Sequence, residues 1–426
     1  MKEREQHRVS SNGISVYSYK NEALHGFYIS LFVRAGSMYE SGSESGITHF
    51  FEHCAIRNLN KMHGDKLYEK LDRMGMELGA STYSEMVQFY ISGASKHFGE
   101  GARLLTDLFS DITLSSSEID AERKRIKAEI RESDDKRSLN TFTASSVFGG
   151  TSLEYSILGT NSSIDKIGKV RLAEFSKKAL CRENVFFYVT GCFTDSDIEE
   201  ILSILDKKHI ISGALHENIA PVPEKFAKRD SAVFVKNADF TMCRLSFDLD
   251  MARYSVAETD LIYDMLLSGN NSKLFIELSE KRGLCYDLGG GCERYKNIGE
   301  LYFTFEVKKS DLYDALKTVV EVLNSMKHKP DVDSVKAGYV DNAYMLYDDS
   351  CELNFTFGYD NHIMDEKYSS IDERKTRYEN ITSERIGAIA RGLFLPRNLT
   401  VTIKGDKKSI SVEKIKEITE ELLNGF

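Results

Sequence analysis

Two histidines and a glutamate within five residues could give this chain hydrolytic chemistry. The stretch His49-Phe50-Phe51-Glu52-His53 reads H-x-x-E-H, the reverse of the zincin motif H-E-x-x-H. On a helix advancing about 100° per residue, His49 and His53 project within about 40° of each other, and Glu52 lies about 60° to the other side of His49. Two imidazoles beside a carboxylate are typical of a catalytic zinc site, which needs one more protein ligand and a water molecule.

The third ligand has to come from another part of the chain, and the segment 116–135 is the densest source of carboxylates nearby. Glu122 and Glu129 are seven residues apart, so on a helix they share a face to within about 20°. Glu129 could bind the metal while Glu122 holds an imidazole in place. The same charges would also suit a solvated helix face with i,i+4 ion pairs. Glu132, one turn further on, is an alternative ligand.

The elements that must position these residues follow from the local patterns of the sequence. A helix predicted over 44–58 carries the two histidines, and its opposite side would pack into a core through Ile47, Phe50, Phe51 and Cys54. Elsewhere in the first half we predict two antiparallel strands within 13–35, a helix near 63–75, a hairpin over 76–94, helices over 96–112 and 116–135, a loop near 136–152, a strand over 184–191 and a helix over 195–207.

The second half repeats this order of elements. The segments NVFFYVTG (184–191) and NLTVTIKG (398–405) occupy equivalent places, each preceded and followed by a predicted helix. We therefore predict an α+β fold of two homologous domains, each with a mostly antiparallel sheet packed with helices. The predicted boundaries are 1–212 for an N-terminal zinc-binding catalytic domain, 213–226 for a linker and 227–426 for a C-terminal domain that helps to enclose substrate.

Composition excludes several classes of protein. The 426 residues carry a formal net charge of −10, which argues against a nucleic-acid binder. No apolar run reaches the roughly 18 residues of a membrane span, and the charged first residues lack the apolar core of a signal peptide. The seven cysteines are scattered, without a C-x-x-C pair, so we expect reduced thiols and a cytoplasmic protein.

The spacing of the motifs resembles the pitrilysin/insulinase family of inverzincin metallopeptidases, which includes mitochondrial processing peptidases and half-length bacterial members. In that family H-x-x-E-H is followed by E-x(6)-E, as Glu122 and Glu129 follow His53 here. Gly46, the segment ILGT (157–160) with Ser163-Ile164, and Asn184 at the start of a strand also match. In the second half, SKLFIELSEKRGLCY (272–286) is similar to a family segment.

This resemblance implies a zinc endopeptidase that cleaves peptides or small unfolded polypeptides inside the chamber of a homo- or heterodimer. His49, His53 and Glu129 would be the zinc ligands. Glu52 and Glu122 would be the catalytic pair, with Glu52 as the base that activates water. Ala80, Ser81 and Thr82 would pair with the substrate backbone by strand addition, and Tyr286 would contact the substrate.

Two positions depart from the family pattern. The family grips its substrate with an arginine and a tyrosine seven residues apart. Tyr286 is present, but Ser279 is at the arginine position. A serine has no guanidinium group to donate hydrogen bonds to a peptide carbonyl. Before Ser81, the usual Asn-Ala is replaced by Gly79-Ala80. We therefore expect a homologous subunit to supply an Arg/Tyr pair. A peptide-binding subunit that does not cleave is the alternative, and the retained Glu52 favours the enzyme.

Overall fold

The computed structural model describes residues 4–213, 232–235, 240–285, 287–295, 298–406 and 408–424. Its described residues divide into two compact units. Unit 1 comprises those within 1–135, 155–220 and 344–371, and unit 2 comprises those within 136–154, 221–343 and 372–426. No helix within the described ranges is both long and apolar enough to cross a bilayer. All seven cysteines are free thiols.

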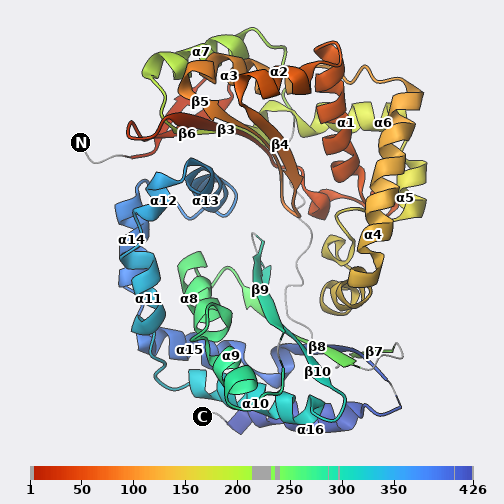
Figure 1. The fold of residues 1–426 in the computed structure, drawn as a ribbon, viewed down its shortest axis with the longest axis vertical. Coiled ribbons are helices and arrows are strands. Elements are labelled where there is room, and N and C mark those ends of the chain that lie inside the picture. Colours follow the sequence, from red (N-terminus) through yellow and green to blue (C-terminus); the bar gives the residue numbers. More distant parts are fainter. Residues whose placement is uncertain are drawn as a thin grey trace. The chain divides into compact units, whose positions relative to one another are not determined.

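Unit 1 is built on a six-stranded sheet with the strand order β1-β2-β6-β3-β5-β4 (Figure 1). Its strands are β1 (Gln6–Val9), β2 (Ser15–Lys20), β3 (Gly26–Val33), β4 (Glu77–Thr82), β5 (Val87–Ala94) and β6 (Val185–Gly191). Its helices are α1 (Ile47–Met62), α2 (Leu67–Met74), α3 (Phe98–Thr106), most of α4 (Ser116–Phe148), α5 (Asn161–Lys166), α6 (Lys169–Ala179), α7 (Asp195–Asp206), α12 (Met345–Asp348) and α13 (Ser350–His362).

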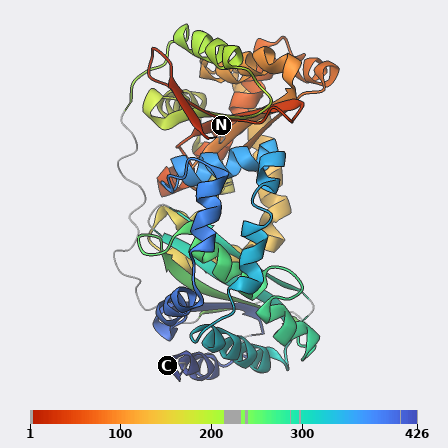
Figure 2. The same ribbon diagram turned by 90° about the vertical axis from the view of Figure 1, so that its left-hand side faces the viewer.

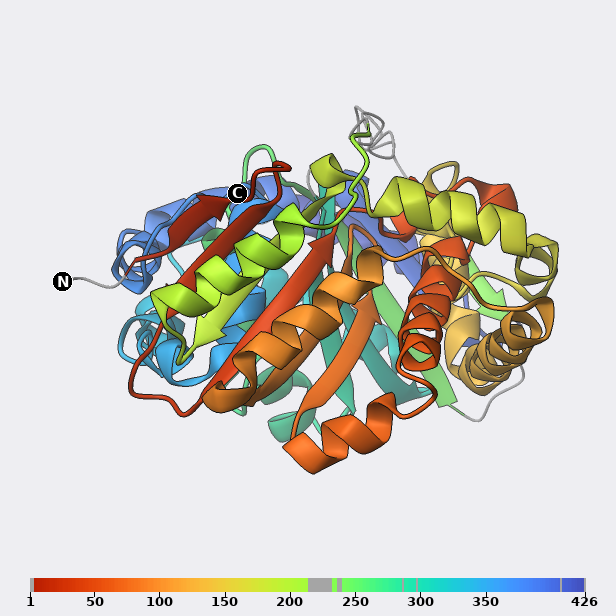
Figure 3. The same cartoon turned by 90° about the horizontal axis from the view of Figure 1, so that it is seen from above.

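Helices cover both faces of this sheet. Seen from above, α3 and α7 lie across one face (Figure 3), where Phe98, Leu105 and Ile201 join the core of β3, β5 and β6. On the other face lies α13, whose Asn354 donates to the carbonyl of Tyr188 at 2.9 Å and accepts from the Ser30 hydroxyl at 2.6 Å. A segment from late in the sequence therefore completes the first unit.

Unit 2 contains a five-stranded sheet with the order β7-β11-β8-β10-β9. Its strands are β7 (Ala232–Val235), β8 (Phe240–Asp250), β9 (Leu288–Arg294), β10 (Ile298–Lys308) and β11 (Leu399–Gly405). Its helices are the end of α4, α8 (Val256–Leu267), α9 (Lys273–Phe275) with the π-helix η7 (Ile276–Glu280), α10 (Leu312–Met326), α11 (Asp333–Val340), most of α14 (Ile371–Glu379), α15 (Ser383–Leu393) and α16 (Val412–Glu420). Helices α10 and α16 pack beside this sheet (Figure 2).

The two sheets repeat one topology, which confirms the predicted α+β fold of two homologous domains. In both, one strand pairs in parallel with the last strand of the sheet in sequence, namely β2 with β6 and β7 with β11, and β1 is an additional edge strand of the first sheet. All the remaining pairs that correspond between the two sheets are antiparallel. The strand 184–191 therefore has its counterpart in 398–405, as their similar sequences indicate.

Some local predictions need correction. The two strands predicted within 13–35 do not pair with each other, because β6 lies between β2 and β3. The loop predicted near 136–152 is largely helical, because α4 continues to Phe148. The compact units also differ from the predicted division at 212 and 227, since residues within 136–154 group with unit 2 and residues 344–371 with unit 1. Most of the predicted linker 213–226 lies outside the described residues.

Candidate metal centre

Helix α1 presents both histidines because it is buried along two sides. Phe51, Ala55 and Leu59 pack against the sheet, and Phe50 and Cys54 pack with isoleucines of α4. The helix therefore cannot rotate without exposing an apolar side chain to water. His49 is buried and His53 half-buried on the remaining face.

A glutamate outside α1 determines where this helix begins. The Glu40 carboxylate, next to the short helix η1 (Ser37–Tyr39), accepts hydrogen bonds from the backbone N–H groups of Gly46 and Thr48, both at 2.8 Å. These groups have no partner within the helix, so the carboxylate acts as its cap. Gly46 itself has φ of +90°, and a Cβ there would lie 2.8 Å from the carbonyl oxygen of Leu158. Burial raises the pKa of Glu40 to about 7, against the lowering effect of these hydrogen bonds.

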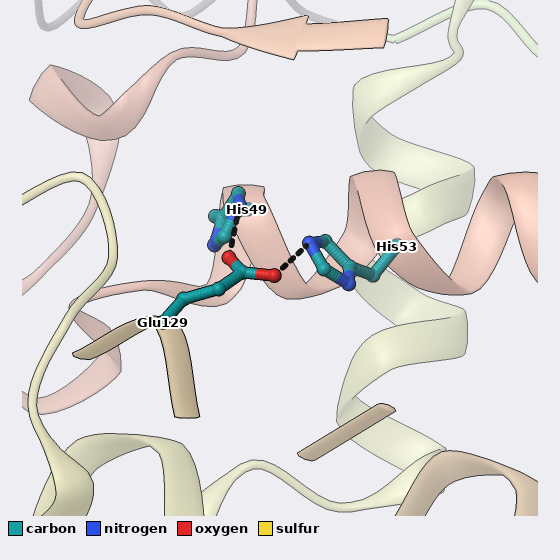
Figure 4. Close-up of side chains that lie close together, drawn as sticks. All are labelled: His49, His53 and Glu129. Carbon is teal, nitrogen blue, oxygen red and sulfur yellow. Dashed lines mark ion pairs between the residues drawn. The ribbon is translucent and has the colours of Figure 1, made fainter. Parts of the chain in front are cut away.

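The long helix α4 brings a third donor to the histidines. Glu129 Oε2 lies 3.6 Å from His49 Nε2, and Glu129 Oε1 lies 3.7 Å from His53 Nε2, so the carboxylate faces both rings (Figure 4). One ligand atom from each of the three residues lies within 4.8 Å of the others. Glu132 is exposed on α4 and stands outside this group.

Glu122 lies behind His53 rather than beside the other donors. It is almost completely buried, and its Oε2 lies 3.2 Å from His53 Nδ1 while its Oε1 accepts from Arg57 Nη1 at 2.6 Å. Burial alone would raise the pKa of Glu122, but the hydrogen bonds to His53 and Arg57 and the charge of Arg125 outweigh it and lower the pKa to about 2. The carboxylate is therefore ionised, and His53 Nδ1 must be the donor.

That tautomer provides a test of whether a metal fits. In the neutral ring with its proton on Nδ1, the form of histidine that binds metals, His53 Nε2 carries a lone pair directed towards Glu129 Oε1 at 3.7 Å. Two acceptors facing each other repel unless a cation lies between them. Two imidazole nitrogens and one carboxylate oxygen form the donor set of many catalytic zinc sites, so the three side chains fit zinc.

Glu52, on the same helix as the two histidines, contacts a neighbouring strand. Its Oε2 accepts a hydrogen bond from the hydroxyl of Thr82 at the end of β4. Burial raises the pKa of Glu52, although the Thr82 hydroxyl and the charge of His53 act in the opposite direction. A carboxyl group with a raised pKa beside a metal site is suited to proton transfer near neutral pH.

The remaining predicted residues lie in different places. Ala80, Ser81 and Thr82 are half-buried on β4, which is an edge strand of its sheet. Ser279 is in the π-helix η7 of unit 2. Tyr286 lies outside the described residues.

Glu40 and Arg57 were not predicted from the sequence. Arg57 is four residues after His53, a spacing that places both side chains on one face of the helix. This spacing could have suggested a partner for Glu122. Glu40 gives no such signal, because it reaches α1 from a separate turn.

Comparison with known proteins identifies the family of this chain. The family profile described as Insulinase (Peptidase family M16) matches residues 15–161, and the profile described as Peptidase M16 inactive domain matches residues 166–338. The chain belongs to peptidase family M16. This family uses zinc, the metal that the donor set of His49, His53 and Glu129 fits.

Individual relatives support this membership over most of the chain. An uncharacterised zinc protease of Bacillus subtilis, YmxG, is 22% identical over 396 residues, covering 90% of this chain and 94% of the relative. The mouse mitochondrial-processing peptidase subunit beta is 28% identical over 299 residues, 68% of this chain and 60% of the relative. The crystal structure of a protease from Helicobacter pylori superposes with a TM-score of 0.82 at 15% identity, covering 95% of this chain and all of that one, and so shares its fold.

Proposed function

We propose that this chain is a zinc-dependent endopeptidase that cleaves peptides or small unfolded polypeptides inside a dimeric chamber. The observation that carries the proposal is the convergence of His49, His53 and Glu129 within 4.8 Å, with Glu52 on the same helix as both histidines. Those three side chains would hold the metal. When bound, zinc polarises the scissile carbonyl and lowers the pKa of water towards about 7.

The residues of this chain would supply the proton transfers. Thr82 occupies Oε2 of Glu52, which leaves Oε1 to accept the proton of the attacking water and return it to the leaving amine. Glu122 would fix the ring of His53 so that Nε2 stays unprotonated.

The edge strand β4 would hold the substrate. Beyond β5, no other described strand pairs with β4, so its outer edge is available for an extended peptide to add as a further strand. Ala80, Ser81 and Thr82 would provide this backbone pairing. Since Thr82 also contacts Glu52, such a peptide would run past the base.

We further propose that a homologous partner subunit supplies the Arg/Tyr pair that grips the substrate. Ser279 supports this assignment, because its hydroxyl cannot replace a guanidinium. The mouse relative is itself described as a subunit. We place the assembly in the cytoplasm, which agrees with seven unpaired cysteines. Full peptidase activity of the purified chain as a homodimer would contradict the division of labour between subunits.

The experiment that tests the cleavage reaction compares the chain with its Glu52→Gln variant. Zinc content is measured by elemental analysis, and cleavage is followed with a library of quenched fluorescent peptides, with and without a co-expressed homologous subunit. We expect both proteins to bind zinc and only the unmodified chain to cleave. Bound zinc with equal background cleavage by both would instead favour a peptide-binding subunit that does not cut.

A further inference from the structure

A cavity in unit 2 is lined by residues that neither the metal centre nor the proposed cleavage uses. It has a volume of about 660 Å³ and lies among the end of α8, the loop 268–272, the start of α9, η7, α10 and α11. Met265 and Val322 are buried in its wall, whereas Ser268, Asn270 and Ser334 are exposed at its rim. A concave site of this size is typical of small-molecule binding, and here most lining residues are polar or charged, with Met265, Ile276, Val322 and Val335 supplying apolar surface.

Negative charge prevails around this cavity. Four carboxylates and two cations line it, namely Asp264, Glu277, Glu321, Asp331, Lys273 and Arg282. Arg282 is already bound, because its Nη1 donates to Glu277 at 2.9 Å and its Nη2 donates to Glu321 at 3.0 Å. The guanidinium is therefore not available to neutralise a further carboxylate.

Asp331 and Asp264 form no ion pair among the described residues, and of the two only Asp264 is shielded from solvent. Asp264 is half-buried, and its Oδ2 accepts a hydrogen bond from the Tyr339 hydroxyl at 2.7 Å. One turn earlier on α8, Asp260 is paired with Arg294 and accepts from the Tyr378 hydroxyl. No lysine or arginine in the described part of the chain forms an ion pair with Asp264. Burial raises the pKa of Asp264, while the Tyr339 hydroxyl, the Ser268 side chain and the charge of Arg294 act in the opposite direction. A half-buried carboxylate that accepts hydrogen bonds but forms no ion pair is stabilised further by a ligand that brings a positive charge.

The local backbone also differs from ordinary helix at this wall. Ile276 and Glu277 belong to the π-helix η7. This conformation is rare in proteins, and where it occurs it is often at a functional site. Next to the lining residue Lys273, the buried Ser272 hydroxyl has no hydrogen-bond partner among the described residues.

We propose that this cavity binds a small organic cation, a protonated amine carried on an apolar body. The ammonium group lies at Asp264, and the apolar body packs against Met265 and Val322. This activity goes beyond the proposed peptidase function and holds whether or not the chain cleaves peptides.

The test uses the full chain and three probes of one shape that differ in charge: 4-phenylbutylamine, 4-phenylbutan-1-ol and 4-phenylbutanoate. Binding is measured by isothermal titration calorimetry, and its place by the ¹³C-methyl signal of Met265, assigned with Met265→Leu. We expect the amine to bind saturably and shift that signal, and the alcohol and the acid to bind at least about tenfold more weakly, since a charge-assisted contact is lost. N-acetyl-lysine methylamide tests whether a lysine within a peptide serves as well as a free amine.

Two matched variants test whether Asp264 binds the ammonium group. Asp264→Asn should weaken binding of the amine by about tenfold or more. Asp314→Asn, an exposed acid of α10 outside the cavity, should leave binding unchanged. Equal affinity for the amine and the alcohol, no saturable binding, or a Met265 signal that does not move would each overturn the proposal. The probe series and the Met265 signal use the unmodified side chain of Asp264, so they decide the question even if Asp264→Asn fails to fold.

Discussion

Replacing Glu122 with glutamine should weaken zinc binding although Glu122 is not itself a ligand. In the native chain its two oxygens serve two donors, His53 Nδ1 at 3.2 Å and Arg57 Nη1 at 2.6 Å. A glutamine side chain has one acceptor oxygen and one amide NH₂ group of nearly the same shape. If the oxygen faces Arg57, the NH₂ group faces His53 Nδ1 and favours the tautomer in which Nε2 carries the proton.

The size of the effect follows from the contact that is lost. A hydrogen bond to a charged group contributes about 1.5–3 kcal/mol, and about 1.4 kcal/mol corresponds to tenfold in affinity. We therefore expect Glu122→Gln to bind zinc roughly 10- to 100-fold more weakly, in the range found for residues that orient metal ligands. Since the pKa of Glu122 is about 2, its carboxylate stays ionised and the ratio of the two affinities should change little from mildly acidic to mildly alkaline pH.

The assay is a competition titration of metal-free protein with zinc and a chromophoric chelator. Glu132→Gln is the matched control, because it makes the same change on the same helix at an exposed position outside the donor group, and its affinity should stay within about twofold of the parent. Circular dichroism of the metal-free proteins establishes that each is folded. A folded Glu122→Gln protein with native zinc affinity would refute the reasoning.

Three further predictions concern Glu40 at the start of α1, the proposed base Glu52 and the binding of zinc. Folding raises the pKa of Glu40 to about 7. The stabilisation that comes from this protonated side chain is therefore full below the pKa of the unfolded state and is lost as the pH rises through about 7. Between mildly acidic and mildly alkaline pH, the free energy of unfolding measured in urea should fall by on the order of 2 kcal/mol more for the parent than for Glu40→Gln. Thr82→Val should lower kcat about fivefold through loss of one hydrogen bond to Glu52, while Thr82→Ser retains activity; equal kcat for both variants would count against this role. Zinc at about 100 times its Kd should raise the free energy of unfolding by about 2.7 kcal/mol, and calorimetry of Glu129→Gln at the same zinc concentration should show a much smaller rise.

Local periodicity predicts which side chains of the metal centre share a helix face, whereas the resemblance to the peptidase family paired the face of α4 with the two histidines. Residues four apart on α1 and seven apart on α4 share a face in any regular helix, and the structure does bring Glu129 to both histidines and Glu122 to His53. The side of α1 predicted to be apolar is buried throughout, at Ile47, Phe50, Phe51 and Cys54.

The predictions that failed depended on contacts between distant residues. The pairing of β2 with β6 joins residues about 170 positions apart. No pattern within residues 13–35 indicates that β6 lies between β2 and β3. The end of α4 reads as a loop because it is rich in serine and threonine, which favour helices weakly. Its Val147 and Phe148 are buried with Ile298, and Thr143 bonds to Thr402 at 2.7 Å. Packing within unit 2 therefore determines the helix there, not the local sequence.

The duplicated fold separates what the architecture provides from what the side chains provide. Helix α8 follows the second strand of its sheet as α1 follows β3, so the two helices occupy corresponding places in one topology. Between Val256 and Leu267, however, α8 contains no histidine, and the profile matching this half is described as inactive. Instead α8 carries Asp260, which is paired with Arg294, and Asp264, which has no ion-pair partner among the described residues. The same scaffold thus carries a cluster of two histidines and a glutamate in one copy and a carboxylate-lined cavity in the other, because function depends on the residues placed on a fold and not on the fold itself.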